Sequence, residues 1–144
     1  MIAIGSDHAG YELKEKVKKL LESMGLAYRD FGTDSTESTD YPDYAHAVAS
    51  AVASGTMERG ILVCGTGIGM AISANRHHGV RAANVESVEA AQLSRQHNNA
   101  NIVALGARLL SWEKAEEIVR TFLSTPFEGG RHQRRVDKIE QSEK

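Results

Sequence analysis

The sequence places a candidate base or nucleophile directly before a candidate anion-binding loop. An apolar run ends at Cys64, the only cysteine of the chain, and Gly65, Gly67 and Gly69 follow before a segment with helical character. A thiol placed where a strand leads into a helix can be activated as a thiolate by the positive end of the helix dipole. Glycines let backbone N–H groups approach an anion closely, so this stretch could hold a developing oxyanion. The structural alternative is a small buried side chain at a strand end.

Histidine and arginine residues elsewhere could supply the other groups of such a site. Asp7 and His8 follow the first apolar segment, and His97 stands in an asparagine-rich run at the end of an expected helix. A histidine can move protons near neutral pH. Arg131 and Arg135 are four residues apart, so they would share a helix face and could bind phosphate. The structural alternatives are a turn, a helix cap and a solvated basic tail.

A nucleotide-binding loop is a rival interpretation of the glycines. Gly65 and Gly67, with Glu86 about twenty residues further on, partly match the dinucleotide-binding fingerprint. However, Met70 stands where the third glycine of that fingerprint belongs. The P-loop is also absent, because no Gly-Lys-Ser/Thr follows. The loop alone therefore indicates a bound anion and no particular nucleotide.

The remaining histidines do not indicate a metal site. His77 and His78 are adjacent, so they would point apart on a helix, and we expect them at the surface. His46 has no obvious partner in the sequence. No spacing of histidine, cysteine or carboxylate residues matches a zinc or calcium signature.

The composition is that of a globular protein with one domain. The 144 residues are 41% hydrophobic and 25% charged, and they suffice for one domain but not comfortably for two. A net charge of −2 gives no general reason to expect nucleic acid or an anionic membrane as a partner. A single cysteine excludes an internal disulfide, and no apolar run approaches the ~18 residues that span a bilayer. The N-terminus lacks the features of a signal peptide, so we expect a cytoplasmic protein.

Short apolar segments alternate with segments of helical periodicity along the chain. Strands are expected at residues 1–6, 26–31, 60–64, 80–85 and 101–105. Helices are expected at residues 10–24, 44–53, 68–75, 87–96 and 111–124, with a loop at 32–42. Residues 131–143 are polar and do not look like core. This alternation predicts a three-layer α/β domain whose parallel sheet is covered by helices on both faces.

Two further expectations concern the helices. Ser111 is placed to cap the helix at 111–124. On the helix at 87–96, the inner side is expected to carry Val88, Ala91 and Gln92.

Several polar segments should meet at one edge of the sheet. Ligands of parallel α/β sheets collect at the carboxyl ends of the strands. Asp7 and His8, residues 64–69, Glu86 and residues 106–108 each come directly after an expected strand. We expect these segments to line one common rim.

Six motifs along the chain together resemble one enzyme family. They occupy residues 5–11, 40–44, 64–70, 94–101, 106–108 and 129–135. In this order they are similar to the motifs of the ribose-5-phosphate isomerase type B family, which also includes the galactose-6-phosphate isomerase subunits. The resemblance implies a Rossmann-like fold with a five-stranded parallel sheet, and a single domain over residues 1–144. Within it, residues from about 127 to 144 would form a C-terminal arm that carries phosphate-binding arginines.

The resemblance also implies roles for individual residues. Cys64 matches the base that takes a proton from the sugar, and Thr66 is a further candidate catalytic residue. His97 matches the residue that helps to open the sugar ring, and it would act from the second subunit of a homodimer, or of a tetramer. No cofactor and no metal ion is implied. The expected substrate-binding residues are Asp7, His8, Tyr41, Gly65, Thr66, Gly67, Ile68, Gly69, Asn98, Arg108, Arg131 and Arg135.

The activity that the resemblance implies is the interconversion of D-ribose 5-phosphate and D-ribulose 5-phosphate through a cis-enediolate, as in the pentose phosphate pathway. Two alternatives stay open. One is an isomerase of a six-carbon sugar phosphate, such as allose 6-phosphate or galactose 6-phosphate. The other is a non-catalytic module that binds a nucleotide or a sugar phosphate.

Overall fold

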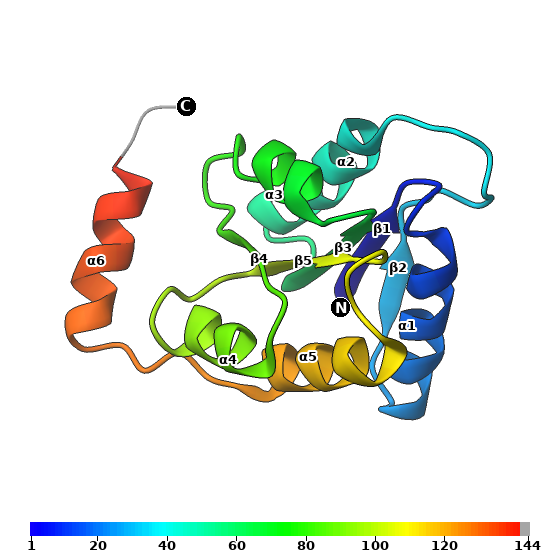
Figure 1. The fold of residues 1–144 in the computed structure, drawn as a ribbon. Coiled ribbons are helices and arrows are strands. Elements are labelled where there is room, and N and C mark those ends of the chain that lie inside the picture. The colour runs from blue at the N-terminus through cyan, green and yellow to red at the C-terminus, as the bar shows by residue number, and fades with distance from the viewer. Residues whose placement is uncertain (142–144) are drawn as a thin grey trace.

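The computed structural model describes residues 1–141 and shows a parallel sheet between two layers of helices (Figure 1). Its five strands stand in the order β2-β1-β3-β5-β4. The strands are β1 (Ile2–Ser6), β2 (Tyr28–Asp30), β3 (Arg59–Cys64), β4 (Ala82–Asn84) and β5 (Ile102–Gly106). The helices are α1 (Tyr11–Ser23), α2 (Tyr41–Ala53), α3 (Ile68–Ala74), α4 (Val88–Gln96), α5 (Trp112–Ser124) and α6 (Arg131–Glu140). The predicted three-layer α/β architecture is confirmed.

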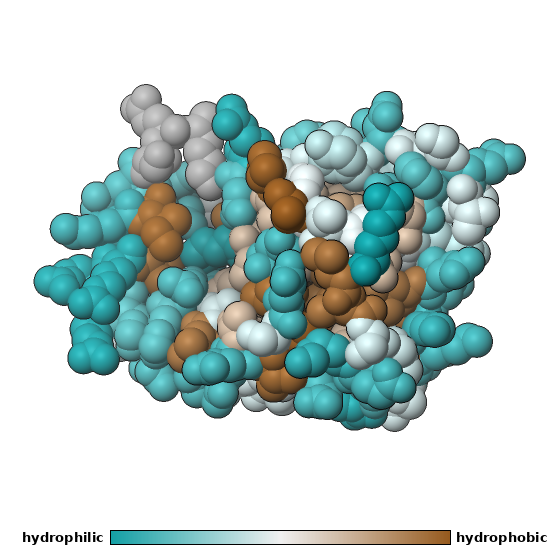
Figure 2. All heavy atoms as spheres, in the orientation of Figure 1, coloured by the Kyte–Doolittle hydropathy of each residue, from teal (hydrophilic) through white to brown (hydrophobic). Residues whose placement is uncertain are grey.

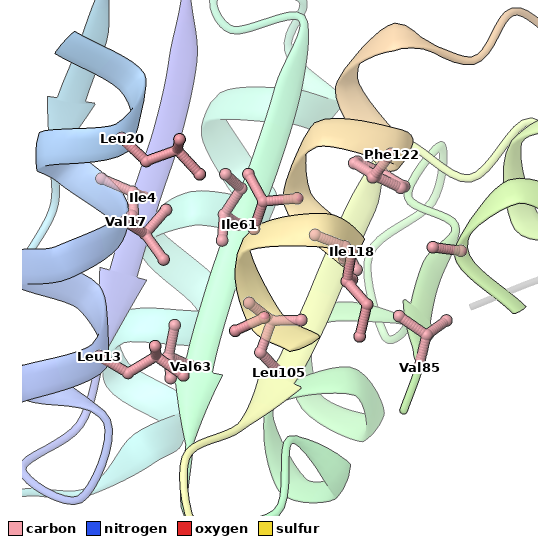
Figure 3. Close-up of a cluster of buried hydrophobic side chains, with 14 of the residues drawn as sticks. Ile4, Leu13, Val17, Leu20, Ile61, Val63, Val85, Leu105, Ile118 and Phe122 are labelled. Atoms are coloured by element: carbon pink, nitrogen blue, oxygen red, sulfur yellow. The ribbon is translucent and has the colours of Figure 1, made fainter. Parts of the chain in front are cut away.

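The two faces of the sheet contribute to two separate apolar cores. On β3, Ile61 and Val63 pack with side chains of α1, α4 and α5, as Figure 3 shows in part. Leu62 and Cys64, the alternate residues of the same strand, pack with α2 and α3. This division follows from the two-residue period of side chains along a strand. Cys64 therefore belongs to the α2/α3 core and stands at its open end.

The chain order creates a crevice at the carboxyl ends of β1 and β3. These strands are neighbours in the sheet. The helix that follows β1 covers one face of the sheet, and the helix that follows β3 covers the other face. The connections therefore diverge, and such a divergence is where parallel α/β sheets bind ligands.

Helix boundaries agree with the sequence expectations except at α2. The expected cap is confirmed, because the hydroxyl of Ser111 accepts a hydrogen bond from the N–H of Lys114 at 3.2 Å. α2 begins at Tyr41, three residues before the expected start at residue 44. Asp40 takes the extended cap position and Pro42 lies in the first helical turn, where a proline is tolerated because that N–H needs no partner. No helix in residues 1–141 has the length and apolar character to cross a membrane.

Two expectations about burial are wrong. On α4, Gln92 is exposed, and Ser94 and Arg95 are the polar residues that turn inward. The C-terminal segment also contributes to the interior, since His132 and Val136 on α6 are buried. Positions 142 and 143 of that segment lie outside the described residues. Arg95 can be buried because its guanidinium donates to the carbonyls of Thr125 and Ala100.

A lysine without a role in the sequence interpretation is fully buried. Lys14 on α1 is 0% exposed, and its Nζ lies 2.8 and 2.9 Å from the carboxylate oxygens of Asp30. It also donates to the carbonyl of Thr33. Burial alone would raise the pKa of Asp30, but hydrogen bonds from Lys14 and Lys18 outweigh burial and lower that pKa. This ion pair ties α1 to the end of β2 and to the loop that follows it.

Candidate active site

The crevice between β1 and β3 opens into a pocket of about 480 Å³. Residues from four parts of the chain line it: Asp7, His8, Ala9, Tyr41, Cys64, Gly65, Thr66, Ile68, Gly69, Ile72 and Arg108. The structure thus brings most residues of the expected rim together. Glu86 is exposed after β4 and is not among the lining residues.

Cys64 stands at the floor of this pocket, at the end of β3. Its side chain is 4% exposed, and its Sγ accepts a hydrogen bond from the N–H of Gly67 at 3.1 Å. The next turn is closed by the hydroxyl of Thr66, which accepts from the N–H of Ile68 at 3.2 Å. The loop is therefore folded around the sulfur by its own backbone.

Gly67 is the residue that allows this loop geometry. Its φ of +81° lies in the left-handed region, which residues with a side chain rarely adopt. A Cβ there would also stand 2.4 Å from the amide nitrogen of Asn84 and 3.0 Å from the backbone of Leu105. A side chain at this position would displace the loop from β5, and the N–H would move with it.

The two other loop glycines lie beneath pocket side chains. A Cβ on Gly69 would stand 2.5 Å from the ring of Tyr41, and one on Gly65 would stand 3.2 Å from the guanidinium of Arg108. Tyr41 and Arg108 therefore rest directly on the loop that follows Cys64. The sequence interpretation assigned these glycines to anion approach alone, and the structure adds this packing role.

Asp7 and His8 are both held by backbone N–H groups. One carboxylate oxygen of Asp7 accepts from the N–H of Gly10 at 3.0 Å, which shapes the turn into α1. The Nδ1 atom of His8 accepts from the N–H of Thr39 at 3.1 Å. Asp7 is only 6% exposed, whereas His8 is partly open to the pocket. Both side chains are thus oriented before any ligand binds.

His97, Asn98, Arg131 and Arg135 lie apart from this pocket within one chain. All strands of a parallel sheet point the same way, so α4, which follows β4, ends near the amino end of β5 and not near the carboxyl end of β3. His97 caps α4 at that far end. The two arginines are exposed on α6, which stands beyond the β4 edge of the sheet (Figure 1). A single chain does not bring these residues to Cys64.

Around His97 the structure reveals a cluster that the sequence interpretation missed. The rings of His97 and His132 are stacked, with centroids 4.2 Å apart and planes 9° apart. One oxygen of Glu128 lies 3.8 Å from Nε2 of His97 and 3.5 Å from Nε2 of His132. Burial, and then the nearby His97 and Arg131, lower the pKa of His132. The four-residue spacing of Glu128 and His132 was the available signal.

This cluster has metal-ligating residue types but not metal-ligating geometry. The ligand atoms of His97, Glu128 and His132 all lie within 4.8 Å of one another. Imidazole binds a metal ion in the plane of its ring. Rings stacked in nearly parallel planes direct their lone pairs side by side, so they do not converge on one ion as they stand.

The expectation for His46 is wrong. Its Nδ1 lies 2.7 Å from Nε2 of His77, with the ring planes tilted by 49°. His46 lies on α2 and His77 follows α3, so the contact joins two helices that pack on the same face of the sheet. His78 is at the surface, as expected.

Comparison with known proteins gives similarity over nearly the whole chain. Residues 2–139 match the Ribose/Galactose Isomerase family. Ribose-5-phosphate isomerase B of Escherichia coli strain K12 is 49% identical over 138 residues, which cover 96% of this chain and 93% of that protein. A ribose 5-phosphate isomerase structure from Thermotoga maritima is 55% identical, with a TM-score of 0.96, and covers 98% of this chain and 97% of its own.

One similar structure contains a ligand. Ribose-5-phosphate isomerase B from Mycoplasma genitalium, with bound ribulose-5-phosphate, is 43% identical to this chain, with a TM-score of 0.94. The match covers 97% of this chain and 93% of that chain. The fold around the pocket is thus shared with a protein that binds a phosphorylated pentulose.

Proposed function

The chain belongs to the Ribose/Galactose Isomerase family and is an isomerase, and we propose that it interconverts D-ribose 5-phosphate and D-ribulose 5-phosphate. The observation that carries this proposal is the pocket in which Cys64 lies beside a backbone loop suited to an oxyanion. Relatives named for this reaction match the chain along almost its full length. The reaction moves protons between C1, C2 and their oxygens, so it needs no external oxidant or reductant.

The first step is the opening of the furanose ring. The ring oxygen must gain a proton and the anomeric hydroxyl must lose one, which suits a group that exchanges protons near neutral pH. His97 is our candidate for this group. Because His97 lies far from Cys64 within one chain, we assign the step to His97 of the partner subunit.

The second step is proton transfer between C2 and C1. The Cys64 thiolate removes the proton from C2, and the electron pair of that C–H bond forms the cis-enediolate. A proton moves from O2 to O1 of the enediolate, and the same sulfur returns its proton to C1, so that C2 becomes the carbonyl carbon of the ketose. Gly67 already donates its N–H to the sulfur, so the N–H groups of Gly65 and Thr66 are the candidate donors to the enediolate oxygens.

The phosphate is bound away from the reacting carbons. Arg108 lies over Gly65 at the pocket. Arg131 and Arg135, on the C-terminal arm, would complete the clamp from the partner subunit. Guanidinium groups suit a phosphate because they form paired, charge-assisted hydrogen bonds. Binding energy from the phosphate would hold C1 and C2 at the sulfur.

Apolar side chains at the rim of the pocket support a homodimer with shared active sites. Ile68 and Ile72 line the pocket and are 50% and 63% exposed, and Leu109, next to Arg108, is 52% exposed. Figure 2 shows hydrophobic surface among hydrophilic side chains on one face of the molecule. Apolar side chains exposed together are typical of an interface. In a two-fold dimer, each subunit would present its α6 to the other pocket, and two such dimers could form a tetramer.

A six-carbon sugar phosphate is the second candidate substrate, because the family description includes galactose as well as ribose. In the proposed dimer, the distance between Cys64 and the arginines of α6 sets the number of carbons between carbonyl and phosphate. We expect kcat/KM to be highest for ribose 5-phosphate in a panel with allose 6-phosphate and galactose 6-phosphate. A higher value for a six-carbon substrate would support the second candidate.

Turnover of the purified protein tests the proposal as a whole. Ribose 5-phosphate incubated with the protein alone should yield ribulose 5-phosphate, and in deuterated water deuterium should enter carbon-bound positions of the sugar. Binding of the sugar phosphate without conversion or exchange would overturn the proposal in favour of a non-catalytic binding module. Calorimetric titration with NAD and ATP tests the nucleotide alternative, and we expect no binding.

A further inference from the structure

The imidazole of His8 is held in one orientation and one tautomer. The backbone N–H of Thr39 donates to Nδ1 at 3.1 Å. A ring nitrogen that accepts a hydrogen bond carries no proton, so the ring in this arrangement is neutral and its proton is on Nε2. If both ring nitrogens were protonated, the Nδ1–H of His8 would face the backbone N–H of Thr39, and the two donors would repel each other. Nε2–H is therefore the group that His8 has left for a ligand in the pocket that it shares with Cys64.

The segment that carries the Thr39 N–H is anchored at both ends. At its start, the N–H of Thr33 donates to the carbonyl of Ser6 at 2.7 Å, and the buried Lys14 donates to the carbonyl of Thr33. At its end α2 begins, and the ring of Tyr41 rests on Gly69. The N–H is thus presented to His8 by backbone that is tied both to β1 and to the pocket.

The side chain of Thr39 takes no part in this contact. Its hydroxyl oxygen is buried and has no hydrogen-bond partner within the described part of the chain. The contact with His8 uses the backbone N–H instead. Every residue except proline has this N–H, so the contact can be removed by one substitution and kept by others.

We propose that Thr39, through its N–H, is a positioning residue that holds His8 as a neutral hydrogen-bond donor to an oxygen of the open-chain sugar phosphate. The inference rests on the proposed isomerase function and extends it to the group that polarises the substrate. A fixed N–H donor stabilises negative charge as it develops on a carbonyl oxygen. Because Nδ1 is occupied, His8 does not compete for the proton that Cys64 must remove and return. The two side chains therefore divide the work: the sulfur transfers the proton, and the imidazole stabilises the oxygen.

The first test measures the tautomer directly. Long-range 1H–15N NMR spectra of the unaltered protein distinguish a protonated from an unprotonated ring nitrogen. We expect His8 to show a proton on Nε2 and none on Nδ1, and a proton on Nδ1 would overturn the proposal. This measurement needs no turnover. Conversion of ribose 5-phosphate by the same sample reports separately on the proposed function.

The second test removes the backbone N–H of residue 39 and leaves His8 and Cys64 unchanged. Thr39→Pro should lower kcat about tenfold with a smaller change in KM, since a positioned donor acts mainly in the transition state. It should also release the His8 ring, so that both tautomers appear in the NMR spectra. The matched comparison is Thr39→Ala, which keeps the N–H and loses the unpartnered hydroxyl and the methyl group; its kcat should exceed that of Thr39→Pro by about tenfold. Equal kcat values for the two variants would overturn the proposal.

A second pair of variants covers the case in which Thr39→Pro does not fold, as judged by circular dichroism. His8→Gln keeps an N–H donor near the position of Nε2, whereas His8→Leu has a similar size and no donor. We expect kcat of His8→Gln to exceed that of His8→Leu by about tenfold, the effect of one hydrogen bond in the transition state. Equal kcat values for this pair would overturn the donor role of His8.

Discussion

The pocket at Cys64 and the cluster at His97 are built in different ways. In the pocket, backbone N–H groups hold the functional atoms, as Gly67 holds the sulfur and Thr39 holds His8. In the cluster, side chains from the end of α4, from the loop between α5 and α6, and from α6 contact one another, and His97 keeps 41% of its side chain exposed. Arg131 and Arg135 are exposed on α6, the helix that carries His132.

The difference shows what one chain can prepare alone. In the pocket, the loop after β3 already packs so closely against β5 and Tyr41 that Gly67 and Gly69 have no room for a side chain. Long side chains on an exposed helix acquire a fixed arrangement only when a ligand or a second subunit meets them. We therefore regard the pocket as the preorganised half of the proposed site and the cluster as the half that assembly completes.

Removal of the Cys64 sulfur should have the largest effect on turnover, and it changes only the pocket and not the His97 cluster. Cys64→Ala should lower kcat by at least about a thousandfold, within the range that a general base contributes. The dissociation constant for ribose 5-phosphate, measured by calorimetry, should change only a few-fold, because the arginines remain. Turnover near that of the unaltered protein would contradict the assignment of the base.

Subunit mixing tests whether the two halves meet across an interface. Cys64→Ala and His97→Ala should each be nearly inactive alone. After exchange of subunits, about a quarter of all sites should be intact, because half of the dimers are mixed and each mixed dimer has one complete site. Recovered activity is the measurement. No recovery after mass spectrometry has verified the exchange would contradict the shared site.

Distortion of the loop should have the next largest effect. Gly67→Ala places a Cβ where Asn84 and β5 stand, so kcat should fall by about a hundredfold as the backbone donors move. The matched control is Gly25→Ala, because Gly25 has a similar φ of +71° but no atom within 4 Å of the added Cβ. This control should cost about 1 kcal/mol of stability and leave kcat unchanged. Equal activity of the two variants would mean that the loop geometry is not needed.

Loss of one arginine should have a moderate effect on binding. Arg135→Ala should raise KM for ribose 5-phosphate by about tenfold, the loss expected for one charge-assisted hydrogen bond. Arg120→Ala provides the control, since Arg120 pairs with Glu116 on α5 and lies outside both halves of the site. An unchanged KM for Arg135→Ala would argue against the clamp.

The smallest expected effect is a dependence of stability on pH at the His97 cluster. The pKa of His132 lies below its ordinary value of 6.5, so the unfolded chain takes up a proton at a higher pH than the folded chain. The stability that neutral His132 contributes to the folded state should therefore be present above about pH 6.5. It should be lost as the pH falls through the pKa of His132 in the folded protein. Thermal unfolding between pH 7.5 and 5 checks this. His132→Gln should weaken the dependence of the unfolding temperature on pH. The same dependence in this variant and in the unaltered protein would contradict the prediction.

The sheet and the pocket are largely predictable from the sequence. Alternation of apolar and helical segments places all five strands, and the rule for carboxyl ends places Asp7, Cys64 and Arg108 on one rim. Both signals are local, because each depends on residues within one element and its following loop. The start of α2 is the exception, since Pro42 is equally typical of a loop and of a first helical turn.

Contacts between distant segments are not predictable in this way. Lys14 looks like a solvated residue of α1, and only the arrival of Asp30 and Thr33 makes its burial possible. His132 stacks on His97 because α6 returns to the end of α4, which no periodicity in a polar segment indicates. The contact between Thr39 and His8 spans 31 residues and uses a backbone N–H, which every residue type except proline offers.

The ion pair of Lys14 and Asp30 has a consequence for how this sequence can diverge. Loss of the Asp30 carboxylate would leave the fully buried Lys14 ammonium without its counter-ion, at a cost of about 3–5 kcal/mol. Loss of Lys14 should cost less, because the Asp30 side chain is 25% exposed and also pairs with Lys18. A substitution at Asp30 should therefore require a change at Lys14 among descendants of this sequence, and the two positions should covary even though 16 residues separate them.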